Sequence, residues 1–453
     1  GFPGAAFREG GAGRAYLAQV LGPLLAEARG LRAFAAQSLA EPTPTTAATS
    51  MATGGRGGAG GGATVEDPAA FARLACALHG LAGANLGMVA RAQATTWEAM
   101  REVAAGLPEV FAAFRRFPSA SRLALQLAGH VVDAHVVHLS PADAAALVRV
   151  GLRLVALYRD HHLGRAVLDA SASAASAPSS ALAAAGDAAD RYKDLRALVQ
   201  LLQHLFQRDL VAPVGPSAAP AAPAGAEGDV VQAVFAGLEV LIPLLAADPA
   251  LLRFPKLARG YFTLLALLLE AHPAAVARLP GPQFATLMGT LAFGLRADDP
   301  PVFSDALEAV AALATFHHRA VLHAGAEPSP AANGVGLGAN LACAVAGEPL
   351  APGPGATVLA AFTRILLRRL VFEDGLLAAG AADEAAAPLL PLLLCQPATF
   401  QEIGLGLLAR VRDPAHQGLL RGALEVRTLY YIILPYIIII IIIIRGQWTD
   451  AMT

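Results

Sequence analysis

The feature that most constrains the fold is a run of apolar helices separated by proline, clearest between Leu252 and Ala326. Proline fits the first turn of a helix, but in the interior it removes a backbone hydrogen bond and clashes with the preceding turn. The prolines at 255, 273 and 282 therefore mark where helices start and stop. This segment predicts α-helices over residues 255–271, 282–295 and 302–319, joined by short turns.

The same alternation extends in both directions along the chain. Apolar residues recur at three- and four-residue spacing, which predicts amphipathic helices. The expected helices outside the central run are 14–39, one from Asp67-Pro68 onward, 108–117, 119–138, 144–160, 192–211, 230–247, 356–371, 376–394, 399–410 and 415–426.

No alternation typical of β-strands interrupts these helices. Helix pairs at a period of roughly forty to fifty residues are typical of HEAT-type repeats, in which each pair buries its apolar face against its neighbours. The expected fold class is all-α, a HEAT-like helical-repeat solenoid, that is, an α-α superhelix of the armadillo type.

Composition shifts divide the chain into three parts. Residues 1–139 are expected to hold helical repeats with a low-complexity loop at 41–66. Residues 140–426 hold the more regular repeats, with inserts rich in Ala, Ser, Gly and Pro at 163–190, 212–227 and 325–354 that we expect to be disordered. The chain starts without an initiator methionine, so we expect a fragment of a longer protein.

The third part, residues 427–453, breaks the composition of the rest. Ten of the thirteen residues at 432–444 are isoleucine. One interpretation is a membrane anchor, but the apolar run is shorter than the ~17–25 residues that a spanning helix needs, and Pro435 interrupts it. We interpret the tail as an artefact of the gene model.

Charge and cysteine content exclude several classes of function. Charged residues make up 15% of the 453 residues and the formal net charge is −2, so no basic face for nucleic acid is indicated. Cys76, Cys343 and Cys395 lie far apart and form no CxxC motif, which predicts small buried side chains in a reducing compartment. We expect no signal peptide in the first thirty residues, because they lack a compact apolar core with a cleavage site.

Segments in the regular part occur in a recognisable order. They include Tyr158-Arg159-Asp160, Tyr192-Lys193-Asp194-Leu195, the blocks 253–273 and 284–295, residues 307–314 and Asp413-Pro414. Over roughly residues 140–426 this order resembles the C-terminal part of exportins, nuclear transport receptors of the importin-beta (karyopherin) superfamily.

The resemblance implies a receptor that carries protein cargo out of the nucleus together with Ran in its GTP form. It implies a hypusine-bearing translation factor and a Smad-type protein as cargoes, nucleoporins as further partners, and shuttling between nucleus and cytoplasm. No membrane partner and no cofactor are implied. The alternative is a HEAT-repeat scaffold that binds partners without dependence on Ran.

Motifs of catalysis and metal binding are absent from the sequence, so we expect no enzyme. The glycines at 334, 336 and 338 lie in a Pro/Gly insert and predict a flexible loop. The pairs His161-His162 and His317-His318 are expected to lie at the surface or at helix ends, because adjacent residues point to different faces of a helix.

Acids within apolar helices are the candidates for binding a partner. Glu239, Glu270 and Glu308 each interrupt an apolar helix. On the concave surface of a solenoid, such carboxylates could pair with basic side chains of cargo. The alternative is that each faces solvent or a neighbouring arginine.

Overall fold

The computed structural model describes residues 11–40, 68–87, 93–115, 117–135, 139–173, 192–206, 226–326, 336–343, 357–372, 389–409 and 417–418. Every regular element in these ranges is a helix, so the all-α prediction is confirmed for them. Contacts divide the chain into Gly1–Leu241 (unit 1) and Ile242–Thr453 (unit 2). The division expected at residue 139 stays a prediction.

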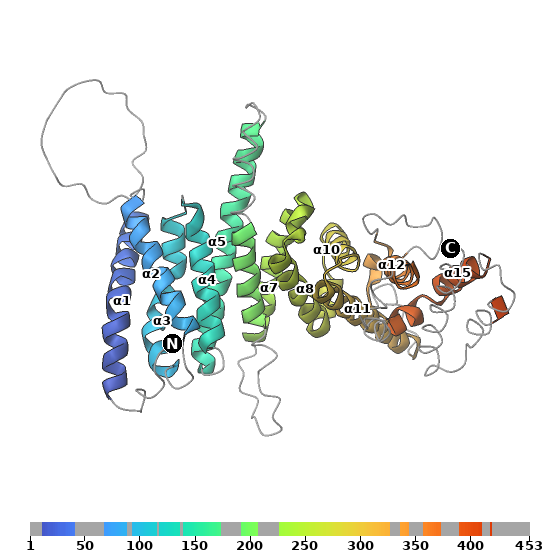
Figure 1. Cartoon of the computed structure of the whole chain (residues 1–453), viewed down its shortest axis with the longest axis horizontal. Helices are drawn as coiled ribbons and strands as arrows, with labels where there is room; N and C mark the ends of the chain where they lie inside the picture. Colours follow the sequence, from blue (N-terminus) through green and yellow to red (C-terminus); the bar gives the residue numbers. More distant parts are fainter. Residues whose placement is uncertain are drawn as a thin grey trace, which may run out of the picture. The chain divides into compact units, whose positions relative to one another are not determined.

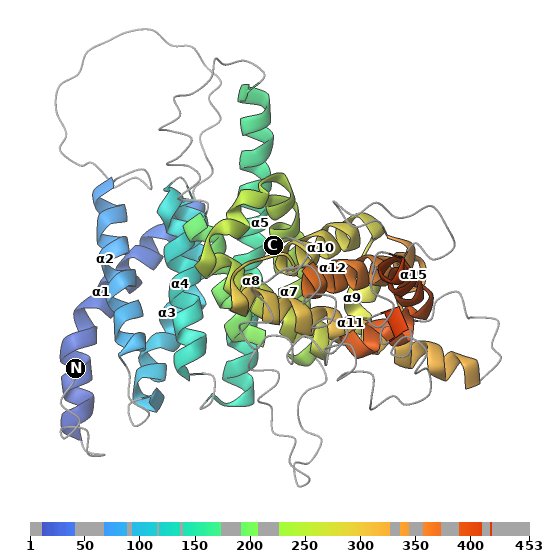
Figure 2. The same ribbon diagram turned by 45° about the vertical axis from the view of Figure 1, so that its right-hand side comes forward.

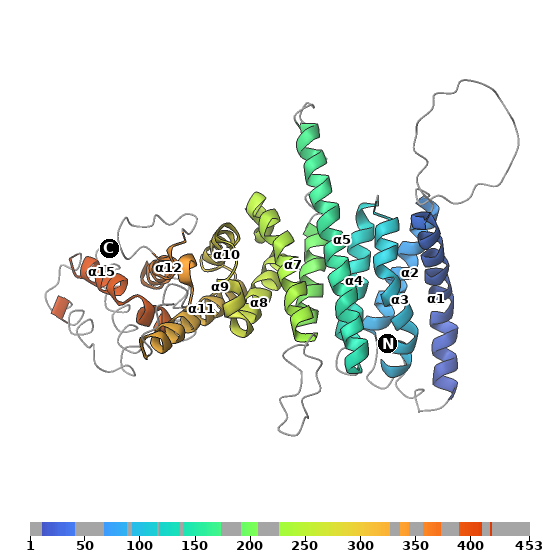
Figure 3. The ribbon, with the colours of Figure 1, turned by 180° about the vertical axis from the view of Figure 1, so that it is seen from behind.

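Unit 1 is a series of long helices that follow one another in chain order (Figure 1). They are α1 (Gly11–Ala40), α2 (Pro68–Leu86), α3 (Gln93–Ala113), α4 (Pro118–His135), α5 (Pro141–Ser173), a helix over 192–206, and the start of α7 (Ala226–Ala247). α1 packs on α2, α3 on α4 and α4 on α5, and second neighbours also pack: α1 contacts α3, α2 contacts α4, and α3 contacts α5. Figure 3 shows α1 to α5 in the same order from behind.

The ion pairs between α1, α3 and α5 show in which direction these helices run relative to one another. The pairs are Arg29–Glu102 at 2.7 Å, Arg32–Glu109 at 3.0 Å, Arg101–Asp143 at 3.6 Å and Arg153–Glu109 at 3.7 Å. Between α1 and α3 the paired residues advance from 29 and 102 to 32 and 109, and between α3 and α5 from 101 and 143 to 109 and 153. The numbers rise in the same direction on both helices of each pair, so α1, α3 and α5 run parallel. Glu109 bridges Arg32 and Arg153 and so joins all three helices.

Apolar stripes predicted from the sequence form the core of unit 1. Leu195, Leu198, Val199, Leu202 and Leu205 are all at most 2% exposed. In α2 the apolar residues at three- and four-residue spacing that are buried are Leu74, Leu78 and Leu81, as an amphipathic helix requires, whereas Phe71 and Ala75 are half-buried.

Two helix boundaries predicted in unit 1 are wrong. The helix expected to begin at Pro108 begins at Gln93 and runs through this proline. Leu107, Val110 and Phe111 around it are buried, and this packing offsets the lost backbone hydrogen bond. The helix expected to end at Asp160 continues to Ser173, because the Ala- and Leu-containing start of the 163–190 insert has good helix propensity and no proline.

Most helices of unit 2 begin at a proline or next to one. They are η3 (Pro249–Arg253), α8 (Pro255–Ala271), α9 (Pro273–Ala277), α10 (Gly281–Gly294), α11 (Pro300–Ala326), η5 (Gly338–Ala342), α12 (Val358–Phe372) and α15 (Pro397–Leu408), with 389–395 also helical. The helix predicted over 255–271 is confirmed at both ends.

The core of unit 2 lies where α8, α10 and α11 meet. α8 packs on α11 and α9, α10 packs on α11, and α10 also contacts α12. Figure 2 shows these helices turned by 45° from the view of Figure 1. Tyr261, Phe262, Phe284 and Phe362 are completely buried. Three of these four aromatic side chains lie in the blocks 253–273 and 284–295 that the sequence singled out, and Phe362 lies in α12.

The inserts differ from the sequence prediction at their ends and at one interior segment. Residues 226–227 belong to α7 and residues 325–326 to α11. Residues 336–343 form a turn and η5, with Leu337 1% exposed. The loop 41–66, the rest of these inserts and the tail 427–453 lie outside the described residues. Among the helices that the structure describes, none is long and apolar enough to cross a membrane.

Candidate functional site

The three predicted partner-binding acids are all exposed on helix surfaces, one in unit 1 and two in unit 2. Glu239 on α7 belongs to unit 1, and its carboxylate lies 3.8 Å from the guanidinium of Arg159. Glu270 near the end of α8 and Glu308 in α11 belong to unit 2, and both are exposed. For Glu239 the structure matches the alternative, a surface acid that meets a neighbouring arginine.

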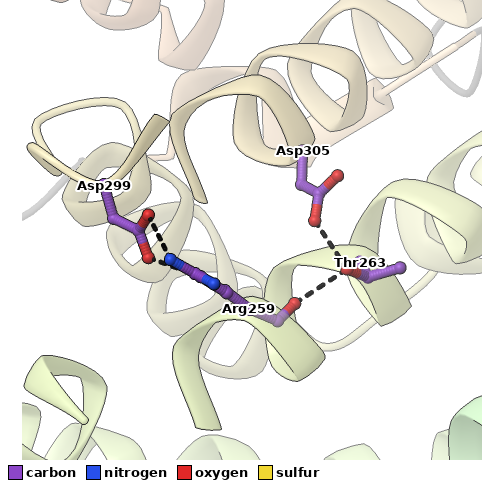
Figure 4. A network of polar contacts seen from close by, with 4 residues as sticks. All are labelled: Arg259, Thr263, Asp299 and Asp305. Atoms are coloured by element: carbon purple, nitrogen blue, oxygen red, sulfur yellow. Dashed lines mark hydrogen bonds and ion pairs between the residues drawn. The ribbon is translucent and has the colours of Figure 1, made fainter. Parts of the chain in front are cut away.

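Four side chains form a polar seam between α8 and the start of α11 (Figure 4): Arg259, Thr263, Asp299 and Asp305. The guanidinium of Arg259 donates from Nε to Asp299 Oδ2 at 2.9 Å and from Nη2 to Asp299 Oδ1 at 3.0 Å. This hydrogen bond raises the pKa of Arg259, so the guanidinium stays charged. A two-point contact of this kind also fixes the angle between the two groups.

The second contact of the seam lies four residues further along α8 and six residues after Asp299, within α11. Thr263 Oγ1 lies 2.6 Å from Asp305 Oδ2 and 2.8 Å from the carbonyl oxygen of Arg259. Burial raises the pKa of the half-buried Asp305 carboxyl, and the hydrogen bond to Thr263 lowers it by a smaller amount. Because 259 meets 299 and 263 meets 305, α8 and α11 run parallel, as α1, α3 and α5 do in unit 1.

A buried hydroxyl pair joins α8 to α10. Tyr261 Oη lies 2.9 Å from Thr290 Oγ1, and Thr290 donates to the carbonyl of Leu287 at 2.7 Å. Since the single hydroxyl proton of Thr290 is used on Leu287, Tyr261 is the donor in the first contact. Burial raises the pKa of Tyr261 far above its ordinary value, so it remains a neutral donor.

Arg369 on α12 holds the end of α10. Its side chain is almost fully buried, donates to the carbonyl oxygen of Leu295 at 2.6 Å, and lies over the ring of Phe303 at 4.8 Å from the centroid. Asp298 lies 3.7 Å away and is fully exposed. The cation therefore caps the C-terminus of α10, where a positive charge is favourable.

The glycine-rich segment has a structural role that differs from the flexible loop we predicted. Gly336 and Gly338 adopt positive φ angles of 64° and 52°. Asn340 then donates to the carbonyls of Ala277 and Leu279, both at 2.9 Å. Glycine permits the left-handed backbone that turns this segment back onto α9.

Histidines and cysteines depart from the sequence prediction at several positions. His317 is 8% exposed in the middle of α11 and accepts a hydrogen bond from the Leu337 amide at 3.4 Å, so its placement at the surface is wrong. Cys76 is exposed and not buried, while Cys395 is half-buried with its pKa raised to about 11 by burial. No group of acids, histidines and cysteines within the described ranges could hold a metal ion.

Sequence reasoning missed Asp305, Arg369 and Asn340. Asp305 could have been found, because it lies one turn from Val302 and from Ala309 on the buried side of α11. The contacts of Arg369 and Asn340 join residues more than sixty positions apart, and periodicity carries no signal for them.

A search against protein-family models finds no match to this chain.

Proposed function

We propose that this chain belongs to a nuclear export receptor similar to exportin-4, which carries protein cargo through the nuclear pore together with Ran-GTP. The fold in this proposal is a HEAT-like solenoid. The observation that carries it is the packing of unit 1, where α1, α3 and α5 run parallel in one series and α2 packs on α4 in a second. Stacked helical hairpins have this arrangement. The resemblance over roughly 140–426 supplies the receptor class.

The proposed mechanism is cooperative binding through the curvature of the solenoid. Each hairpin contacts only its neighbours, so small rotations between hairpins add up along the array. If cargo and Ran-GTP both favour one curvature, each raises the affinity for the other by the same factor.

Glu270 and Glu308 are the acids that we propose for cargo contact. Both carboxylates are exposed on helices that pack against each other, α8 and α11. At Glu239 a cargo cation would compete with the guanidinium of Arg159, which lies 3.8 Å from the carboxylate. Exposed ion pairs contribute ~0.2–1 kcal/mol each, so single neutralisations should weaken cargo binding by only a few-fold.

The test is a pull-down with the complete protein that contains this chain. Ran loaded with GTP or GDP is offered with and without the hypusine-bearing translation factor. The wild type is compared with the double variant Glu270→Gln/Glu308→Gln, and with Glu98→Gln, an exposed glutamate on α3, as matched control.

Mutual dependence of cargo and Ran capture, present only with GTP, would support the export receptor. A loss in the double variant that Glu98→Gln does not share would support the proposed contact. Capture that is indifferent to the nucleotide would favour the alternative, a HEAT-repeat scaffold without Ran dependence.

A further inference from the structure

Residues 336–343, called the strap below, are a short segment of unit 2 that is held by few contacts. They form a turn and η5, which packs on α10 and α12. Within the strap only Leu337 is buried, at 1% exposure. Local stability follows the amount of buried apolar contact, so a segment with one buried side chain opens more readily than the helices on which it lies. We therefore expect the strap to open before α10 and α12 unfold.

The side-chain hydrogen bonds of the strap go to backbone groups at the end of α9. The amide nitrogen of the Asn340 side chain donates to the carbonyl oxygens of Ala277 and Leu279, both at 2.9 Å. Ala277 is the last residue of α9, and Leu279 follows two residues later. Carbonyls at the end of a helix have no donor within the helix, so a side chain, a ligand or water satisfies them. Asn340 uses both of its amide hydrogens for this purpose.

The first residues of the strap are recognised through their backbone and through the absence of one side chain. The Leu337 amide donates to His317 Nδ1 on α11 at 3.4 Å. A Cβ atom at Gly336 would lie 2.5 Å from the same nitrogen, and the φ angle there is 64°, so the position requires glycine. The surface therefore selects three features in order: a glycine, an apolar residue directly after it, and an asparagine three residues further on.

We propose that the surface under the strap, formed by the end of α9, α10, His317 and α12, is a binding site for a peptide segment of a partner protein with these three features. The strap is the internal ligand of this site. The partner segment displaces it and takes over its hydrogen bonds to Ala277, Leu279 and the His317 ring. This site is separate from the carboxylates proposed for cargo contact, and it does not require the chain to be an export receptor.

The connection of the strap to the neighbouring helices determines how strongly a partner segment must compete. Residues 327–335 link the strap to α11, and residues 344–356 lead from it to α12. A short connection gives an effective concentration on the order of 1 mM. Because the strap is docked in the structure, the Kd of its own sequence for the site lies below this concentration. A free peptide of that sequence should therefore bind at mM concentration when the strap is released.

The test is hydrogen exchange of the full chain, read by mass spectrometry on the fragments that cover α9 and α10. The variant Leu337→Asp/Asn340→Ala releases the strap and leaves the helices beneath it unaltered. Exchange of α9 should rise about tenfold relative to the wild type, because two hydrogen bonds to the end of this helix are lost. A synthetic peptide of residues 336–343, added at about 5 mM in reducing buffer, should restore the wild-type rate.

The matched control is the same peptide with alanine in place of Asn340, which cannot donate to either carbonyl and should leave exchange fast. In the wild type neither peptide should change exchange, since the strap occupies the site. The single variant Asn340→Ala covers the case in which the double variant fails to fold, and the unaltered peptide should restore its exchange as well. The proposal is wrong if release leaves exchange of α9 unchanged, if the unaltered peptide restores neither variant, or if the control peptide restores them equally.

Discussion

Gly294, the last residue of α10, is the position where added volume should do most harm. A Cβ atom there would lie 2.4 Å from Phe262 Cε1 and 2.8 Å from the Cβ of Ala306. Carbon atoms in contact normally lie ~3.5–4.0 Å apart. Phe262 is completely buried, and the Cβ of Ala306 is fixed to the backbone of α11. Gly294→Ala must therefore push α10 away from α11.

The expected cost is the difference between two opposing effects. Overpacking a filled core costs ~1–3 kcal/mol. Alanine is up to ~1 kcal/mol better than glycine within a helix, although the benefit is smaller at a helix end. The net change is a loss of ~1–2 kcal/mol in the free energy of opening α10, which is about a 5- to 30-fold rise in its hydrogen exchange.

Gly406 on α15 supplies the matched control, because nothing lies within 4 Å of its added Cβ. Gly406→Ala should slow exchange of α15, since only the helix propensity changes. Both variants are measured by hydrogen exchange of the full chain at one pH. If Gly294→Ala is neutral or stabilising, like the control, the close packing of α10 on α11 that underlies the fold description is wrong.

Two further predictions concern ionisable side chains that are buried or half-buried. Arg369→Met keeps most of the apolar volume but loses the bond to the Leu295 carbonyl and the contact with Phe303, so exchange of α10 should rise by the equivalent of ~2–4 kcal/mol; a change below ~0.5 kcal/mol would contradict this. The pKa values of His130 and His204 are lowered mainly by burial, so the unfolded chain binds protons first and unit 1 should lose stability as the pH falls below about 6.5. Hydrogen exchange of α4, corrected for the intrinsic rate, should become faster at low pH, and this acceleration should be smaller in His204→Gln. Exchange of α4 that does not change with pH would refute the prediction.

Helix positions could be predicted from the sequence where proline and apolar spacing agree. α8 lies between Pro255 and Pro273, and both of its ends were predicted correctly. α3 was misplaced because Pro108 has the sequence signal of a helix start, whereas buried neighbours keep it inside the helix. The end of α5 was missed because Ala-rich sequence has helix propensity without an apolar stripe.

The polar contacts within the site could not be predicted in the same way. Exposure of Glu270 and Glu308 follows from their place among apolar residues at helical spacing. The pairing of Thr263 with Asp305 depends on the register between two helices forty-two residues apart in sequence. One-dimensional periodicity defines the face on which a residue lies, but not the residue that meets it on another helix.

On α8 and α11, the side chains that hold the two helices together differ from the side chains that we propose for cargo contact. The helices are joined by the hydrogen bonds of Arg259 with Asp299 and of Thr263 with Asp305. These contacts therefore determine how the two helices pack. The carboxylates proposed for cargo contact lie on the exposed surface of the same helices. Changes at Glu270 should therefore leave the packing intact, whereas changes in the seam should alter the spacing of the surface that presents the acids. If a partner recognises the spacing between the acids, its affinity should change with substitutions at Glu270 and with substitutions in the seam. If a partner is held by charge alone, its affinity should change only with substitutions at Glu270.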